Sequence, residues 1–83
     1  MNVTLKLYAS LADYLPADAR LNQVQLELPD DATIAMVIER CRLPSKLTHL
    51  VLVNGAFVSP SARAGTRLRE GDHLAMWPPI AGG

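Results

Sequence analysis

The chain contains few of the residues on which metal sites and covalent frameworks depend. Its one cysteine, Cys41, excludes an internal disulfide framework and a cysteine-rich zinc site. The two histidines, His49 and His73, do not match a metal-ligand spacing, and we interpret them as solvent-exposed or edge-strand residues. No long hydrophobic run is present. We therefore expect neither a bound metal nor a membrane span.

An excess of charge of one sign is also absent. Eight basic and eight acidic residues give a net charge of zero, and no aromatic residues are interleaved with the arginines, so a nucleic-acid partner is not expected. Six of the eight basic residues lie from residue 40 onward, which is consistent with a surface there that faces a protein partner.

The chain is too short for a second hydrophobic core. Its 83 residues, 49% of them hydrophobic and 19% charged, favour one small folded domain without an internal active-site cleft of ordinary size. A self-sufficient enzyme is therefore not expected. The first residues lack the basic and apolar regions of a secretory signal, so we expect a cytoplasmic location.

Hydrophobic periodicity predicts the elements of the first half. Every second residue is apolar in residues 2–8 and again in residues 22–28, which predicts two antiparallel strands. Between them we expect a short helix over residues 9–15, with Ser10 as its cap and Pro16 as its end.

The main helix is expected after Thr33, which is the predicted N-cap. Apolar residues then recur with helical spacing at Ile34, Val37, Ile38 and Cys41. On this face Cys41 is interpreted as a small core residue, because no base that would activate it as a nucleophile is identifiable. The acidic pair Asp30-Asp31 is interpreted as part of the turn that leads into the helix.

Turn signals divide the second half. Asn54-Gly55, between two apolar runs, predicts a type I′ hairpin, and Glu70-Gly71-Asp72 predicts a second turn. Residues 61–69 are expected to be irregular and mostly exposed. The last strand, residues 73–77, is apolar on both sides and is expected near the centre of the sheet. These elements predict an α+β fold with one main helix on a mixed sheet, in which the first and last strands are neighbours.

The last seven residues carry the strongest functional signal. Pro78 and Pro79 end the strand and direct the chain outward in an extended form. Gly82 and Gly83 lack a Cβ and can enter a narrow passage with the terminal carboxylate first. We therefore hypothesise that the α-carboxylate of Gly83 is the reactive group. Fully extended, residues 78–83 span roughly 20 Å, enough to reach a buried centre in a partner.

An inert end is the alternative interpretation of this segment, since chain ends are commonly rich in glycine. The apolar pair Ile80-Ala81 favours a functional segment, because a merely solvated tail would more often be polar.

This ending resembles that of the ubiquitin-like β-grasp sulfur carriers of the MoaD/ThiS family, most closely the small subunits of molybdopterin synthase. In that group it typically reads Phe-Pro-Pro, a small aliphatic residue, Ala or Ser, and Gly-Gly. Here Trp77 replaces the phenylalanine and Ile80 the usual valine. The likeness extends over essentially the whole chain and includes the Thr33-led helix and both turns. The diproline distinguishes this group from thiamine-pathway carriers, which usually lack it.

The resemblance implies a two-stage cycle at Gly83. An adenylyltransferase similar to ubiquitin-activating enzymes would adenylate the carboxylate with ATP, and a sulfur donor protein would convert it to a thiocarboxylate. Sulfur would then pass to a pterin precursor in the large catalytic subunit of molybdopterin synthase. The chain itself would bind no cofactor and supply no catalytic side chain.

The resemblance also implies a division into a β-grasp domain over residues 1–77 and an extended tail over residues 78–83. The tail residues expected to contact the partner's channel are Pro78, Pro79, Ile80, Ala81 and Gly82. The candidate docking residues are Phe57, Met76, Trp77, Arg63, Arg67 and Arg69. For the first three the alternative is core packing, and for the arginines it is a solvated surface.

Three other functions stay open at this point. The chain could carry sulfur for another pathway, such as a thiamine-type pathway. It could be a ubiquitin-like modifier that is conjugated to lysines through Gly83. It could also be an interaction domain whose tail is inert.

Overall fold

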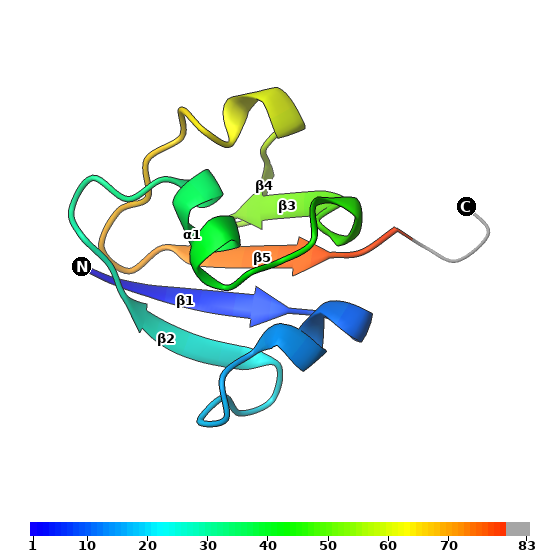
Figure 1. The fold of residues 1–83 in the computed structure, drawn as a ribbon. Coiled ribbons are helices and arrows are strands. Elements are labelled where there is room, and N and C mark those ends of the chain that lie inside the picture. The colour runs from blue at the N-terminus through cyan, green and yellow to red at the C-terminus, as the bar shows by residue number, and fades with distance from the viewer. Residues whose placement is uncertain (80–83) are drawn as a thin grey trace.

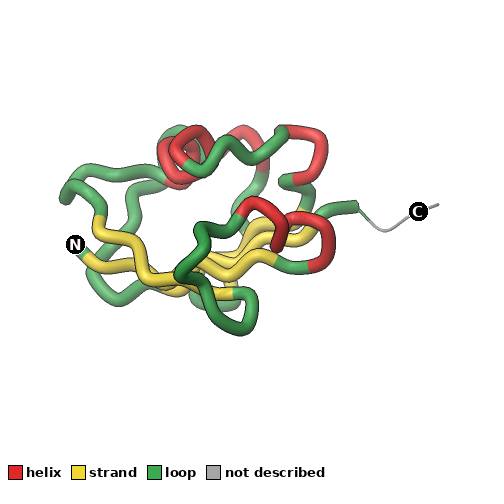
Figure 2. Tube along the Cα trace, turned by 60° about the horizontal axis from the view of Figure 1, so that its bottom comes forward, coloured by secondary structure: helices red, strands yellow, loops and turns green. Residues whose placement is uncertain are grey.

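The computed structural model describes residues 1–79, which form one mixed sheet with helices on one of its faces (Figures 1 and 2). The strands are β1 (Asn2–Leu7), β2 (Gln23–Glu27), β3 (Leu50–Val53), β4 (Ala56–Phe57) and β5 (His73–Trp77). The helices are α1 (Ile34–Arg40) and three short 3₁₀ helices, η1 (Ala9–Tyr14), η2 (Ser45–Leu47) and η3 (Pro60–Ala62). The predicted α+β class is confirmed.

The strand order places the first and last strands side by side at the centre of the sheet. The order is β2-β1-β5-β3-β4, with β1 and β5 parallel and all other neighbours antiparallel. The first and last strands are thus neighbours and β5 is central, as predicted (Figure 1).

The core lies between the sheet and α1. The predicted alternation of apolar and polar residues is confirmed in β1 and β2, where the apolar side chains are buried toward the helix layer. The buried apolar residues are Val3, Leu5, Leu7, Leu11, Val24, Leu26, Leu28, Ala32, Ile34, Val37, Leu43, Val51, Leu68, Leu74 and Met76. This core fixes which face of each strand is left for other contacts.

The N-terminus of α1 has the predicted cap. The Thr33 side-chain oxygen accepts a hydrogen bond from the Met36 backbone N–H at 3.2 Å, which satisfies one of the free donors of the first turn. Of the predicted apolar face, Ile34 and Val37 are buried, whereas Ile38 and Cys41 are half-buried and pack against the core.

The predicted cap of the first helix is wrong. The helix is a 3₁₀ helix that begins at Ala9, so Ser10 lies inside it, and its N-cap position is Tyr8, with no side-chain cap bond. The reason is that sheet pairing continues to Tyr8, whose N–H donates to the Met76 carbonyl at 3.1 Å. Leu11 is buried as expected, but Tyr14 is 39% exposed.

The two predicted turns in the second half are connected to each other. Asn54 and Gly55 have φ values of 50° and 86°, both positive as a type I′ turn requires. The Asn54 side-chain amide donates to Asp72 at 2.8 Å, and its oxygen accepts from the His73 N–H at 2.8 Å. Gly71, with φ 83°, completes the second turn. These bonds fix the start of β5 against the hairpin.

A further tight turn precedes β2. Arg20 and Gln23 exchange backbone hydrogen bonds of 2.9 and 3.0 Å around Leu21 and Asn22. The φ values of these two central residues are 51° and 68°. Asparagine tolerates this left-handed region, but leucine does not favour it. The predicted strand over residues 22–28 is therefore shorter, and it begins at Gln23.

We predict that Leu21→Asn stabilises the protein. Leu21 is 92% exposed, so its side chain gains little from burial while its backbone is in the left-handed region. We expect the free energy of unfolding in urea to rise by about 0.5–1 kcal/mol. Leu21→Ala keeps the backbone cost and serves as the control, with a change of at most about 0.5 kcal/mol. Equal stability of the two variants would contradict the prediction.

Candidate functional site

Backbone hydrogen bonds from two neighbouring segments hold the end of β5. The Tyr8 N–H donates to the Met76 carbonyl and the His49 N–H donates to the Trp77 carbonyl, each at 3.1 Å. Pro78 and Pro79 follow and have no N–H, so the hydrogen-bond ladder ends here. The chain leaves the sheet at this point (Figure 1). Ile80, Ala81, Gly82 and Gly83, the remaining predicted tail residues, lie outside the described residues.

Alternation along β5 decides which of its residues can face a partner. Leu74 and Met76 are fully buried against the core, so Ala75 and Trp77 lie on the opposite face. Met76 is therefore a core residue, and its candidate role in docking is wrong because no part of it is exposed. The half-buried Trp77 stacks on Tyr8, with ring centroids 4.3 Å apart and ring planes 3° apart.

The helix layer leaves the other face of the sheet uncovered (Figure 2). On this face the strand register places Leu50 opposite Trp77, and Leu52 between Ala75 and Phe57. We call these residues the outer patch, which consists of Tyr8, Leu50, Leu52, Phe57, Ala75 and Trp77. Phe57 is 58% exposed and Leu50 is 36% exposed. An apolar surface beside the point where the chain leaves the sheet is suited to a protein contact.

Sequence reasoning found Phe57 and Trp77 but missed the other four members of the outer patch. The period of two in β5 indicates that Ala75 and Trp77 share a face. Tyr8, Leu50 and Leu52 join them only through the pairing of β1, β5 and β3, which links distant segments. The alternation within a single strand does not show which residues of other strands lie beside it.

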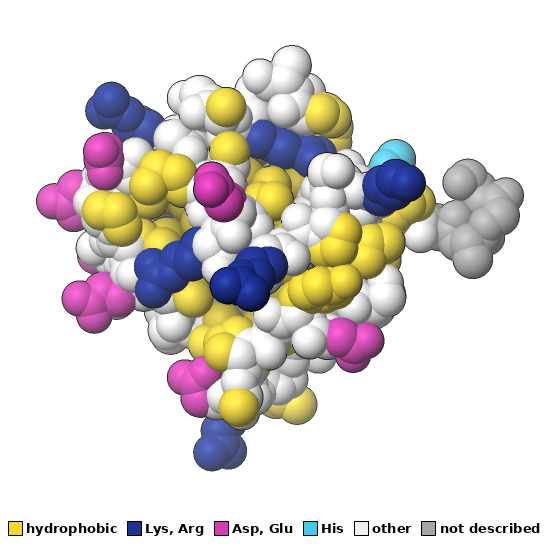
Figure 3. All heavy atoms as spheres, viewed as in Figure 1, with side chains coloured by type: hydrophobic (Ala, Val, Ile, Leu, Met, Phe, Trp, Pro, Cys, Tyr) yellow, Lys and Arg dark blue, Asp and Glu magenta, His cyan; other side chains and the backbone are white. Residues whose placement is uncertain are grey.

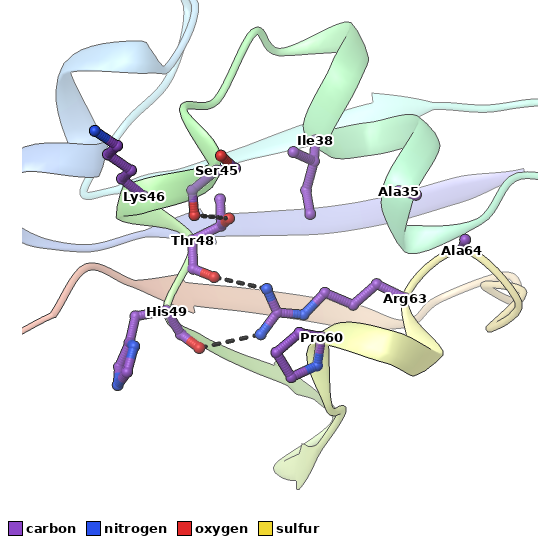
Figure 4. Close-up of a pocket in the computed structure, with 9 residues that line it drawn as sticks. All are labelled: Ala35, Ile38, Ser45, Lys46, Thr48, His49, Pro60, Arg63 and Ala64. Carbon is purple, nitrogen blue, oxygen red and sulfur yellow. Dashed lines mark hydrogen bonds between the residues drawn. The ribbon is translucent and has the colours of Figure 1, made fainter.

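Arg63 is buried, so its expected exposure is wrong. It follows η3, and its Nη1 and Nη2 donate to the carbonyls of Thr48 and His49 at 2.6 and 3.0 Å. These two acceptors lie just before β3, where no strand partner uses them, and they draw the side chain inward (Figure 4). Burial lowers the pKa of the Arg63 guanidinium, which nevertheless stays charged near neutral pH. Arg67 and Arg69 are exposed, as predicted.

Cys41 has the environment of a packing residue. It is half-buried against the core, and burial raises the pKa of its thiol despite the opposing effect of Arg40. The reactive thiolate is therefore disfavoured near neutral pH.

The histidines lie at opposite ends of β5, and both are exposed. Within residues 1–79 the structure has no group of three or more His, Cys, Asp or Glu residues that could hold a metal ion. In the same part of the chain, every helix is too short or too polar to cross a membrane.

A sequence profile of the ThiS family matches residues 5–83. The chain belongs to the ThiS family. The match includes the diproline and the final Gly-Gly, and it confirms the resemblance to the MoaD/ThiS sulfur carriers. A comparison with curated proteins found no match.

Solved structures show the same fold as this ThiS-family chain. The HVO 2177 protein of Haloferax volcanii is 25% identical, with a TM-score of 0.78 over 100% of this chain and 87% of that one. SAMP1 of Haloferax volcanii is 26% identical, with a TM-score of 0.70 over 100% of both chains. A chain of the complex of molybdopterin-converting factor subunits 1 and 2 from Helicobacter pylori is 15% identical, with a TM-score of 0.61 over 100% of both, and shows the fold alone. The predicted ubiquitin-like β-grasp fold is confirmed.

We predict that Arg63→Met destabilises this ThiS-family domain. The substitution leaves two carbonyls without their donors, and removal of a buried cation offsets only part of that loss. We expect the free energy of unfolding in urea to fall by about 2 kcal/mol. The matched control is Arg67→Met at an exposed position, with an expected change within about 0.5 kcal/mol. The prediction fails if both variants unfold at the same urea concentration.

Proposed function

We propose that the chain is a sulfur carrier that acts through the α-carboxylate of Gly83, as the small subunit of a molybdopterin synthase. The observation that carries the proposal is a ThiS-family β-grasp domain whose central strand ends in a diproline beside an exposed apolar patch. The similar fold within the complex of molybdopterin-converting factor subunits 1 and 2 supports a large-subunit partner.

The chemistry of the carboxylate requires two other proteins. A carboxylate is a poor electrophile, so an adenylyltransferase first transfers AMP from ATP to the Gly83 oxygen, with release of pyrophosphate. Sulfide delivered by a donor protein then attacks the acyl carbon, displaces AMP and leaves a thiocarboxylate. In the large subunit this sulfur attacks a carbon of the pterin precursor and displaces an oxygen leaving group, and hydrolysis of the resulting thioester returns the Gly83 carboxylate. We place the cycle in the cytoplasm, where ATP is available.

The domain contributes position rather than catalysis in this proposal. Trp77 is bonded through its carbonyl to His49 and stacked on Tyr8, so the last strand residue has a fixed place. Pro78 and Pro79 restrict the backbone that follows and reduce the entropy lost when a partner binds the tail. A partner that covers the outer patch then receives the tail from a defined starting point.

A protein modifier is the second candidate function. SAMP1 is a small archaeal modifier protein by name, and it is 26% identical over the full length of this chain. Recovery of Gly-Gly remnants on lysines of other proteins would favour this function. Capture of a thiazole synthase in place of a pterin-binding subunit would instead favour a thiamine-type carrier.

We predict that sulfur is gained at the C-terminus. Incubation with the activating enzyme, ATP and a sulfide donor should raise the intact mass by the difference between one sulfur and one oxygen atom. Deletion of Gly82 and Gly83 should abolish this gain. Cys41→Ala should retain it, because the half-buried Cys41 thiol has a raised pKa. A gain of a whole sulfur atom that is lost in Cys41→Ala would place the sulfur on the cysteine and contradict the proposal.

We predict that Phe57→Asp weakens binding to the large subunit. The substitution places a charge in the exposed apolar surface of the outer patch, and we expect the Kd to rise about tenfold in isothermal titration calorimetry. The control is Met36→Asp, because Met36 is also apolar and exposed but lies on α1. A similar loss in both variants would argue against docking through the outer patch.

A further inference from the structure

A groove with a volume of about 450 Å³ lies on the helix side of the domain, between α1, η2 and η3. Its apolar walls come from Ala35 and Ile38 on α1 and from Pro60 and Ala64 around η3 (Figure 4). Arg63 extends along it from η3 toward the start of β3. This groove is separate from the outer patch, which lies on the uncovered face of the sheet.

The buried guanidinium in this groove has no counter-ion among the residues that the structure describes. Arg63 is 7% exposed, and within residues 1–79 no carboxylate lies within ion-pair distance of it. Both Nη atoms are bonded to neutral carbonyls, and Nε is buried without a hydrogen-bond partner. A buried cation that is only partly compensated is costly, and the cost falls when an anion approaches.

The rim of the groove has the same sign of charge. Lys46 and His49 line it on the side toward the end of β5, and none of its lining residues is acidic. Both side chains project away from Arg63, and the Lys46 ammonium extends the positive surface along the rim (Figure 4). In the space-filling view, a basic side chain lies beside the histidine at this end of the molecule, other basic side chains are spread over the face, and most acidic side chains lie toward the opposite end (Figure 3).

The composition of the groove favours a peptide over a free anion. A free phosphate gains most from an accessible guanidinium, but Arg63 is only 7% exposed and two of its five N–H groups are already bonded to carbonyls. The walls offer apolar contact instead, which suits a carboxylate attached to an apolar segment. The location also suits a partner of the tail, since the His49 N–H bonds to the Trp77 carbonyl.

We propose that this groove binds a segment of a partner protein in which apolar and acidic residues alternate. The segment would place its apolar side chains against Ile38 and Pro60 and its carboxylates near Arg63 and Lys46. A partner that receives the tail would then contact the domain on both faces of the sheet. The proposal concerns recognition and does not depend on sulfur transfer.

The test is a titration of the ¹⁵N-labelled full chain, followed by NMR, with the capped peptide Leu-Glu-Leu-Glu. We expect saturable shifts at the amides of Lys46, His49 and Ala64 and at the Arg63 Nε–H. The same peptide with glutamine in place of glutamate should bind much more weakly. Lys46→Gln should raise the Kd about two- to fivefold, and Lys6→Gln, on the uncovered face, should leave it unchanged.

Three results would overturn the proposal. They are equal binding of the glutamine peptide, an absence of saturable shifts in the groove, and saturation of the same shifts by inorganic phosphate, which would indicate a site for free anions. The gain of sulfur measured by intact mass is independent of this titration. Failure of the groove and failure of the proposed function are therefore distinguishable.

Discussion

The parallel pairing of β1 with β5 is the interaction on which the rest of the structure depends. It brings the first and last strands together, with Leu5 beside Leu74 and Leu7 beside Met76 in the core. The same register leaves Tyr8 and Trp77 on the uncovered face, where their rings stack. The same pairing therefore stabilises the domain and fixes the place of Trp77, directly before the diproline. It is a non-local contact, because residues near the start of the sequence pair with residues near its end and the chain between them forms one long loop.

Local signals predicted the elements well because each has a local physical cause. The Thr33 cap, the Asn54-Gly55 turn and the alternation in β1 depend on residues a few positions apart. The central place of β5 was also predictable, because a strand that is apolar on both faces is more typical of the middle of a sheet than of its edge.

The predictions failed where a distant contact overrides the local pattern. Ser10 lost its cap position because β5 pairs as far as Tyr8. Arg63 was expected in solvent with Arg67 and Arg69, since no local feature indicates the carbonyls that it reaches in residues 48 and 49. Of the candidate site, Phe57 and Trp77 were identified from their side chains alone, but their apolar neighbours depend on the register of three strands.

The stacked pair at the end of β5 gives the molecule its own optical reporter. Trp77 is the chain's one tryptophan, so its emission comes from a single place, directly before the diproline. Tyr8, one of two tyrosines, lies against it and can transfer excitation to it. Any protein that covers the outer patch changes the polarity around this indole. Binding at this end of the domain can therefore be followed by fluorescence in the unmodified protein, without an added label.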